Sequence, residues 1–197
     1  MGIMERNHGL DLQLVLNAFR AISAANKQDL ESAATRLGLD SSIQLNILFI
    51  LYCNGGVRIT TIAEWTFWHT SSIVIHVRKL MEKGLVTIEK SEQDGRVVNV
   101  FITDEGRELV LQYYQQNLHS FQLAKALKSM ENRYSHAVLA LFKELLDFIA
   151  VEVQGEEKLS WLKRSDNPFL SLEEWSREED KRTERKGEPQ EGVGTAP

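Results

Sequence analysis

The hydrophobic pattern of this chain changes its period at Gly84, and this change limits the possible fold more than any other feature. Within residues 70–83, apolar side chains recur at helical spacing, and five of them share one side: Ile73, Val74, Val77, Leu80 and Met81. In 86–91 and again in 97–103, apolar and polar residues alternate, which is typical of β-strands. The intervening Gln-Asp-Gly at 93–95 favours a tight turn. The sequence therefore predicts a helix that ends at a glycine and is followed by a β-hairpin.

Helical periodicity also predicts three helices before this one. A long amphipathic helix covers residues 10–37. Asp40 or Ser41 then caps a second helix, which ends at the Asn-Gly-Gly of 54–56. A shorter third helix is expected at about 60–66.

Two helices are predicted after the hairpin. Thr103 caps the first, whose acidic first turn suits the positive end of the helix dipole, and we expect this helix to continue without a break to Leu127. The second, at about 132–153, carries more large apolar residues than one packed seam can bury. It therefore requires a further surface to pack against.

Length and composition exclude several classes of protein. With 197 residues, of which 43% are hydrophobic, the chain can bury one core with an extension. No apolar run approaches the ~20 residues that cross a bilayer, and the N-terminus lacks the pattern of a signal peptide, so we expect a cytoplasmic protein with no membrane association. The single cysteine, Cys53, excludes an internal disulfide framework and a cysteine-rich zinc site. No catalytic motif is visible, so we expect neither an enzyme nor a bound cofactor or metal.

The composition shifts beyond Gly155. Residues 155–175 retain tryptophan, leucine and phenylalanine, and they could dock on the core as a short helical arm. Residues 176–197 are rich in charge and poor in large apolar side chains, so we expect a disordered tail there.

The order of the predicted elements is that of a winged helix-turn-helix, a fold that is mainly α with a small β-hairpin wing. On a helical wheel, the polar side of 70–83 faces away from its apolar side. Small hydroxyl groups in the first turn permit close approach to base edges or phosphates in a major groove, basic residues add charge, and an isoleucine can contact a thymine methyl group. The candidate DNA-binding residues on this helix are Thr70, Ser71, Ser72, Ile75, His76, Arg78 and Lys79.

The hairpin adds a second candidate contact with DNA. Arg96 follows the turn closely, where an arginine on a wing can enter the minor groove or hold the backbone. Asp94 could pair with Arg96 or with another arginine and make the wing rigid. Taken alone, the polar side of 70–83 favours an ordinary solvated helix, and it is the hairpin that favours the DNA-binding interpretation.

Several motifs of the chain resemble the MarR-type winged-helix regulators. These motifs are IAEW, the helix HTSSIVIHVRKLMEKGLV, the D-x-R of the wing, the following FITDEG, and the glutamine of SSIQLNIL. The resemblance covers residues 10–153. A narrower likeness, to the Hpr (ScoC) group of Bacillus-type repressors of protease and sporulation genes, rests on WHTSS, the end of the recognition helix and the acidic tail.

The resemblance implies a fold, a partner and a function. It implies an obligate homodimer in which 10–37 and 104–153 form the dimerisation helices and 40–103 forms the DNA-binding domain. It implies a transcriptional regulator, usually a repressor, which binds a pseudo-palindromic operator with 70–83 in the major groove and 92–96 on the minor groove or backbone. Residues that would read bases are Ser71, Ser72, His76 and Lys79, with Arg96 as the wing arginine. Some family members also bind a small aromatic effector.

The charge of the chain limits how strongly it can bind DNA. The net charge is −5, yet Arg58 to Arg96 carries six Lys and Arg against five Asp and Glu. If each half-site neutralises about three phosphates, the logarithm of the DNA-binding constant falls with the logarithm of the salt concentration with a slope of about −5.

The alternative hypothesis is a winged module that binds another protein through its acidic tail and does not bind DNA. An enzyme with a winged dimerisation domain is a third reading, but few residues remain after 153 for a catalytic domain.

Three other groups of residues could have either a structural or a functional role. His69 and His76 lie seven residues apart, too far for one metal without further ligands, so we expect structural or DNA-contacting histidines. Cys53 ends the second helix in apolar company, which favours an inert thiol over a redox switch. Trp65, Phe67 and Trp68 favour core packing over an aromatic ligand site.

Overall fold

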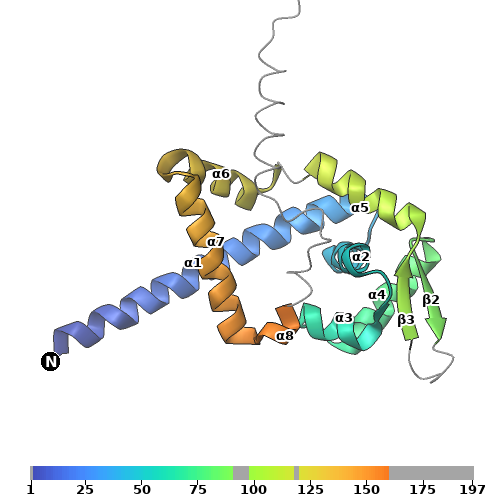
Figure 1. Cartoon of the computed structure of the whole chain (residues 1–197), viewed down its shortest axis with the longest axis horizontal. Helices are drawn as coiled ribbons and strands as arrows, with labels where there is room; N and C mark the ends of the chain where they lie inside the picture. The colour runs from blue at the N-terminus through green and yellow to red at the C-terminus, as the bar shows by residue number, and fades with distance from the viewer. Residues whose placement is uncertain (1, 91–97, 118–119, 160–197) are drawn as a thin grey trace, which may run out of the picture. The chain divides into compact units, whose positions relative to one another are not determined.

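The computed structural model describes residues 2–90, 98–117 and 120–159, and it confirms a mainly helical winged helix-turn-helix with a small antiparallel sheet (Figure 1). The elements are α1 Gly2–Arg36, α2 Ser42–Asn54, β1 Val57–Arg58, α3 Ile59–Thr66, α4 Thr70–Glu82, β2 Val86–Lys90, β3 Val98–Ile102, α5 Asp104–Asn117, α6 Gln122–Tyr134, α7 His136–Gln154 and α8 Glu156–Leu159. The predicted helices up to Gly84 and both hairpin strands are confirmed within one or two residues, except that α1 starts earlier than expected. The short strand β1 was not predicted. Helix α8 falls at the start of 155–175, where a short helical arm was expected, and the rest of that segment and the tail 176–197 lie outside the described residues.

The sheet has the strand order β1-β3-β2, with both pairs antiparallel. In the β2–β3 hairpin, Val86 lies opposite Ile102 and Ile88 lies opposite Val100. Val100 is fully buried and also lies opposite Val57 of β1, so the central strand carries the apolar residues that attach the wing to the helices. The hairpin turn at 93–95 lies outside the described residues.

Helix α2 is the centre of the core and contacts α1, α4, α5 and β3 (Figure 1). Its sequence is apolar on almost every side, as expected for a helix surrounded by other elements. The largest fully buried apolar side chains are four of its own residues and others from α3, α4, β3 and α5: Ile47, Leu48, Ile50, Leu51, Ile62, Ile73, Leu80, Val100 and Val110.

The end of α4 follows from Gly84, which adopts a φ of +71°. The Gly84 N–H donates to the Met81 carbonyl at 2.9 Å, and the Leu85 N–H donates to the Leu80 carbonyl at 3.0 Å. These two bonds form a Schellman motif, in which a residue other than glycine would be strained. Thr103 is also tied to this turn, because its hydroxyl donates to the Gly84 carbonyl at 2.8 Å while accepting from the Gly106 N–H of α5 at 3.1 Å. The predicted capping role of Thr103 is therefore confirmed.

The prediction of one continuous helix from Thr103 to Leu127 is wrong. The chain forms two helices, α5 and α6, and Phe121 stands in extended conformation at the start of α6 with φ −65° and ψ 138°. Phe121 is buried, and its ring lies 5.9 Å from the ring of Tyr113 at an angle of 62°. The Gln122 N–H donates to the Asp29 carboxylate of α1 at 2.6 Å. Burial of one aromatic ring and a cap from a distant helix thus stabilise the break.

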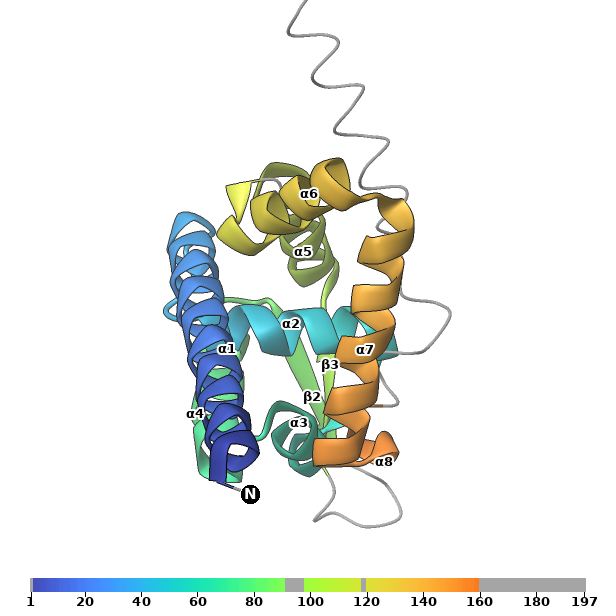
Figure 2. The same ribbon diagram turned by 90° about the vertical axis from the view of Figure 1, so that its left-hand side faces the viewer.

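Large apolar side chains remain exposed on α1 and α7. They are Leu12, Leu14, Val15, Leu16, Phe19 and Ile22 on α1, and Val138, Leu141, Leu145, Phe148, Ile149 and Val153 on α7. The expectation that the last helix needs a further surface is consistent with this exposure. Helix α7 continues into α8, which contacts α3 of the same chain, as both views show (Figures 1 and 2). No helix among the described residues is long and apolar enough to cross a membrane.

Candidate nucleic-acid interface

Helix α4 is held in place by a narrow apolar stripe. Ile73, Val77 and Leu80 are all at most 3% exposed, and the helix packs on α2 and α3. The sequence predicted a wider stripe that included Val74 and Met81, but these two residues are 44% and 38% exposed. That part of the prediction is wrong, because the neighbouring helices cover only the middle of the apolar side. The rest of the helix surface is open.

Five of the seven predicted DNA-binding residues of α4 lie on this open surface. Thr70, Ser71, Ile75, Arg78 and Lys79 are exposed, and Ile75 is 56% exposed despite being apolar. Ser72 and His76 are half-buried on the flank of the helix. A row of hydroxyl, apolar and cationic groups along one exposed side has the chemical variety that direct contact with base edges and phosphates requires.

The first turn of α4 presents its own donors. His69 is the N-cap residue, and its carbonyl accepts the Ser72 N–H at 2.9 Å and the Ile73 N–H at 3.2 Å. The His69 Nδ1 lies 3.1 Å from the Ser71 hydroxyl. The first N–H groups of a helix have no acceptor within the helix. Together with the helix dipole, they favour an anion such as a phosphate at this end of α4.

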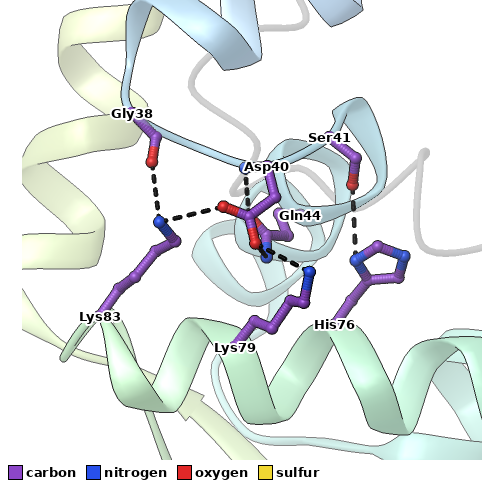
Figure 3. Close-up of polar contacts among 7 residues, drawn as sticks. All are labelled: Gly38, Asp40, Ser41, Gln44, His76, Lys79 and Lys83. Atoms are coloured by element: carbon purple, nitrogen blue, oxygen red, sulfur yellow. Dashed lines mark hydrogen bonds and ion pairs between the residues drawn. The ribbon is translucent and has the colours of Figure 1, made fainter.

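On one flank, α4 contacts the loop between α1 and α2 through charged side chains (Figure 3). Lys79 Nζ lies 3.1 Å from Asp40 Oδ2, and Lys83 Nζ lies 3.1 Å from Asp40 Oδ1. Lys83 also donates to the Gly38 carbonyl at 3.0 Å. The hydrogen bond from Lys79, followed by the one from Lys83, lowers the pKa of Asp40 below its ordinary value. Asp40 is therefore ionised at neutral pH.

Gln44 supports this loop from beneath. It is fully buried on α2, and its Oε1 accepts the Asp40 N–H at 2.8 Å. The Gln44 Nε2 lies 3.5 Å from Asp40 Oδ2. Burial of a polar side chain is costly unless it is hydrogen-bonded, so Gln44 fixes the backbone of Asp40 at a defined place relative to α2.

His76 faces the same loop. Its Nδ1 lies 3.4 Å from the Ser41 hydroxyl (Figure 3). Burial and then the charge of Lys79 lower the pKa of His76, so the ring is neutral at pH 7.

The predicted cap of α2 is corrected here, because neither Asp40 nor Ser41 makes a side-chain cap bond. Glu31 of α1 accepts the Ser42 N–H at 3.0 Å instead.

Sequence reasoning missed the role of Asp40 and Lys83. Asp40 was expected only as a helix cap, and Lys83 was not a candidate at all. The ion pairs join residues that are 39 and 43 positions apart, and no local pattern indicates such a contact. The two candidate residues of the wing, Asp94 and Arg96, lie outside the described residues, so their roles remain predictions.

The other candidate groups have the following surroundings. Burial raises the pKa of the Cys53 thiol to about 11, which agrees with an inert thiol. Trp65 and Trp68 are half-buried, but Phe67 is 51% exposed, so the expectation of core packing is wrong for Phe67. The Lys158 ammonium of α8 lies 5.6 Å from the centre of the Phe67 ring. No three His, Cys, Asp or Glu side chains within the described ranges are grouped so that they could hold a metal ion.

Comparison with known proteins identifies the type of the winged-helix segment. Residues 41–98 match the model of the MarR family. The HTH-type transcriptional regulator Hpr of Exiguobacterium sibiricum is 33% identical over 112 residues, which cover 54% of this chain and 54% of that protein. The matched segment thus spans about half the length of this relative. The resemblances to MarR-type winged-helix regulators and to Hpr that the motifs predicted are confirmed by these matches.

Solved structures share the fold at lower sequence identity. A MarR protein from Peptoclostridium difficile superposes with a TM-score of 0.60 at 16% identity, covering 76% of this chain and 90% of that protein. NadR, solved in complex with 4-hydroxyphenylacetate, superposes with a TM-score of 0.52 at 21% identity, covering 68% of this chain and 90% of NadR. These likenesses establish the winged-helix fold of the described residues.

Proposed function

We propose that the protein is a homodimeric, sequence-specific DNA-binding transcriptional regulator of the cytoplasm, and that it acts as a repressor at a pseudo-palindromic operator. The observation that carries this proposal is the division of α4 into two sides. Ile73, Val77 and Leu80 attach the helix to the core, while Ser71, Ile75, Arg78 and Lys79 remain exposed. The match of residues 41–98 to the MarR family supports the same assignment.

In the proposed complex, the exposed side of α4 enters the major groove. Its first turn brings Thr70, Ser71 and Ser72 to phosphates and base edges, and Ile75 contacts a thymine methyl group. Arg78 and Lys79 lie one turn further along. The wing residues Asp94 and Arg96 are assigned to the minor groove or backbone beside the helix.

The proposed dimer uses the exposed apolar residues of α1 and α7. A large exposed apolar surface is rare on a monomer and marks an interaction site, so the exposure of these residues supports the proposed dimer. Two-fold symmetry would place two copies of α4 about 34 Å apart, one turn of B-form DNA, which is why the operator is expected to be pseudo-palindromic. In this proposal, residues 10–37 and 104–153 form the dimerisation helices, and residues 40–103 form the DNA-binding domain.

A small aromatic effector is part of the proposal. NadR has the same fold and was solved with 4-hydroxyphenylacetate bound. Aromatic carboxylates of this kind are therefore the first compounds to test, by their effect on the thermal unfolding of the dimer. A compound that binds the folded state raises the unfolding temperature, and the rise grows with the logarithm of its free concentration above the dissociation constant.

The test of DNA binding is selection of duplexes from a random-sequence library, followed by titration of the selected site. We expect Arg78→Ala to weaken binding about tenfold or more. The matched control is Arg133→Ala, which removes the same charge from α6, and it is expected to leave the affinity within about twofold. Both variants must dimerise as the wild type does. Failure of the wild type to enrich any sequence would favour the alternative, a winged module that binds another protein, and unchanged binding by Arg78→Ala would reject the assigned side of α4.

A further inference from the structure

One carboxylate on the rim of α4 holds two of the cationic side chains of that helix. Asp40 lies in the loop between α1 and α2, and its two oxygens are divided between Lys79 and Lys83, each at 3.1 Å (Figure 3). Lys79 is one of the residues assigned to DNA in the proposed function. In the free protein, its ammonium is therefore already paired with an acid of the same chain.

The two lysines are held to different degrees. Lys83 has a second acceptor, the Gly38 carbonyl at 3.0 Å, and its side chain is 34% exposed. Lys79 has no second acceptor among the described residues, and its side chain is 46% exposed. An exposed ion pair is weak, because water screens the charges and both side chains lose freedom. Lys79 can therefore be drawn away from Asp40, while Lys83 stays.

We infer that Asp40 competes with a DNA phosphate for the ammonium of Lys79 and thereby weakens DNA binding. This inference rests on the proposed function. When DNA arrives, Lys79 exchanges the carboxylate for a phosphate oxygen, and Asp40 remains bound to Lys83. Asp40 is thus a residue that acts through Lys79 and sets the affinity of the dimer.

The hydrogen bonds of the loop explain why the Asp40 carboxylate stays beside α4. Its N–H is bound to the buried side chain of Gln44 at 2.8 Å, so the loop cannot carry the carboxylate away from α4 at low cost. Glu31 and His76 also lie on this flank, but Glu31 is occupied by Ser42 and His76 is neutral at pH 7. Asp40 is therefore the acid that pairs with the cations of this part of α4.

The first test is the variant Asp40→Asn, which keeps the size of the side chain and removes its charge. Binding is measured by fluorescence anisotropy on two duplexes of roughly three helical turns, one of mixed sequence and one selected by the wild type from random DNA. We expect Asp40→Asn to bind both duplexes about fivefold more tightly at low salt, with a gain that shrinks as salt rises. The matched control, Glu108→Gln on α5, removes the same charge from an exposed position and is expected to change affinity by less than about twofold.

A second pair of variants asks whether Asp40 acts through Lys79. In the background of Lys79→Met, the further change Asp40→Asn should tighten binding by less than about twofold, because the cation for which Asp40 competes is gone. A purely structural role for Asp40 would give the same effect with and without Lys79. The cycle thus separates competition from a change in folding.

The outcomes divide as follows. Weaker or unchanged binding by Asp40→Asn would overturn the inference, and so would an equal gain in the Lys79→Met background, while either result leaves the proposed function intact. If the wild type binds neither duplex, the proposed function fails and takes this inference with it. If Asp40→Asn does not fold, Asp40→Ser is measured in its place, with the same expected gain.

Discussion

The break between α5 and α6 gives the sharpest test of how this fold is held together. Phe121 is 7% exposed, and its ring packs against Tyr113 with a centroid distance of 5.9 Å. Replacing a buried phenylalanine by alanine costs about 3–5 kcal/mol, and the cost rises with the cavity that remains. Phe121 stands between two helices that can close towards it, so we expect Phe121→Ala to cost about 3 kcal/mol.

The variant Phe121→Leu separates burial from the contact between rings. Leucine restores most of the buried apolar volume but loses the edge-to-face pair with Tyr113, which is worth about 0.5–1.5 kcal/mol. We therefore expect Phe121→Leu to cost about 1 kcal/mol. The measurement is urea unfolding followed by far-UV circular dichroism, at one fixed protein concentration because the stability of the proposed dimer would depend on concentration.

The control for this prediction is Leu111→Ala on α5, where the side chain is 40% exposed. Its cost should be about 0.5 kcal/mol or less. If Phe121→Ala proves no more destabilising than Leu111→Ala, burial of Phe121 does not hold the break, and the capping of Gln122 by Asp29 would have to do so alone. Hydrogen exchange at the Gln122 N–H measures that second contribution directly.

Four further predictions concern the whole protein. The affinity for a selected operator should fall with a logarithmic salt slope of about −5, and a slope close to zero would contradict the proposed phosphate contacts. The hydrogen bond from Ser42 lowers the pKa of Glu31 below its ordinary value of 4.5, so its contribution to stability is complete above pH 4.5 and lost as the pH falls further; the acid-induced fall in unfolding temperature should therefore be smaller in Glu31→Gln. With a pKa of about 11, the Cys53 thiol should react with a disulfide reagent at pH 8 about a hundredfold more slowly in the folded protein than in urea, and fast labelling of the folded protein would refute its assignment as inert. Leu145→Glu, on the exposed apolar side of α7, should disrupt the proposed dimer and give a monomer in analytical ultracentrifugation, whereas Lys143→Glu on the opposite side of the same helix should not.

Local sequence signals predicted the boundaries of an element correctly where hydrogen bonds within the neighbouring turn decide them. Gly84 predicts the end of α4 because a left-handed residue is needed there, and Thr103 predicts the start of α5 because its hydroxyl can accept the Gly106 N–H. The two strands follow from the period of two in their apolar residues. Local signals failed at Phe121, because the sequence around it continues a helical period and the reason for the break lies on another helix.

In the candidate site, too, some features could be predicted from the local sequence and others could not. The period of apolar residues in 70–83 indicated which side of α4 packs and which side is exposed, although Val74 and Met81 show that the width of the packed stripe depends on the neighbouring helices. The ion pairs of Asp40 could not be predicted. Their strength depends on how closely the fold brings a loop to a helix some 40 residues later in the chain, and sequence separation does not set that distance.

The sequence by itself determined the order of the helices up to Gly84 and of the two hairpin strands, the two sides of α4 and the places where glycine must end a helix. These features depend on hydrogen bonds and side-chain periods within a few residues. Only the tertiary structure decided that Asp29 caps α6, that Glu31 takes the place of a cap on α2 and that Asp40 pairs with Lys79. Each of these contacts joins segments far apart in the chain, and a charge–charge or hydrogen-bond energy depends on the distance through space between the two groups, which only packing of the core fixes.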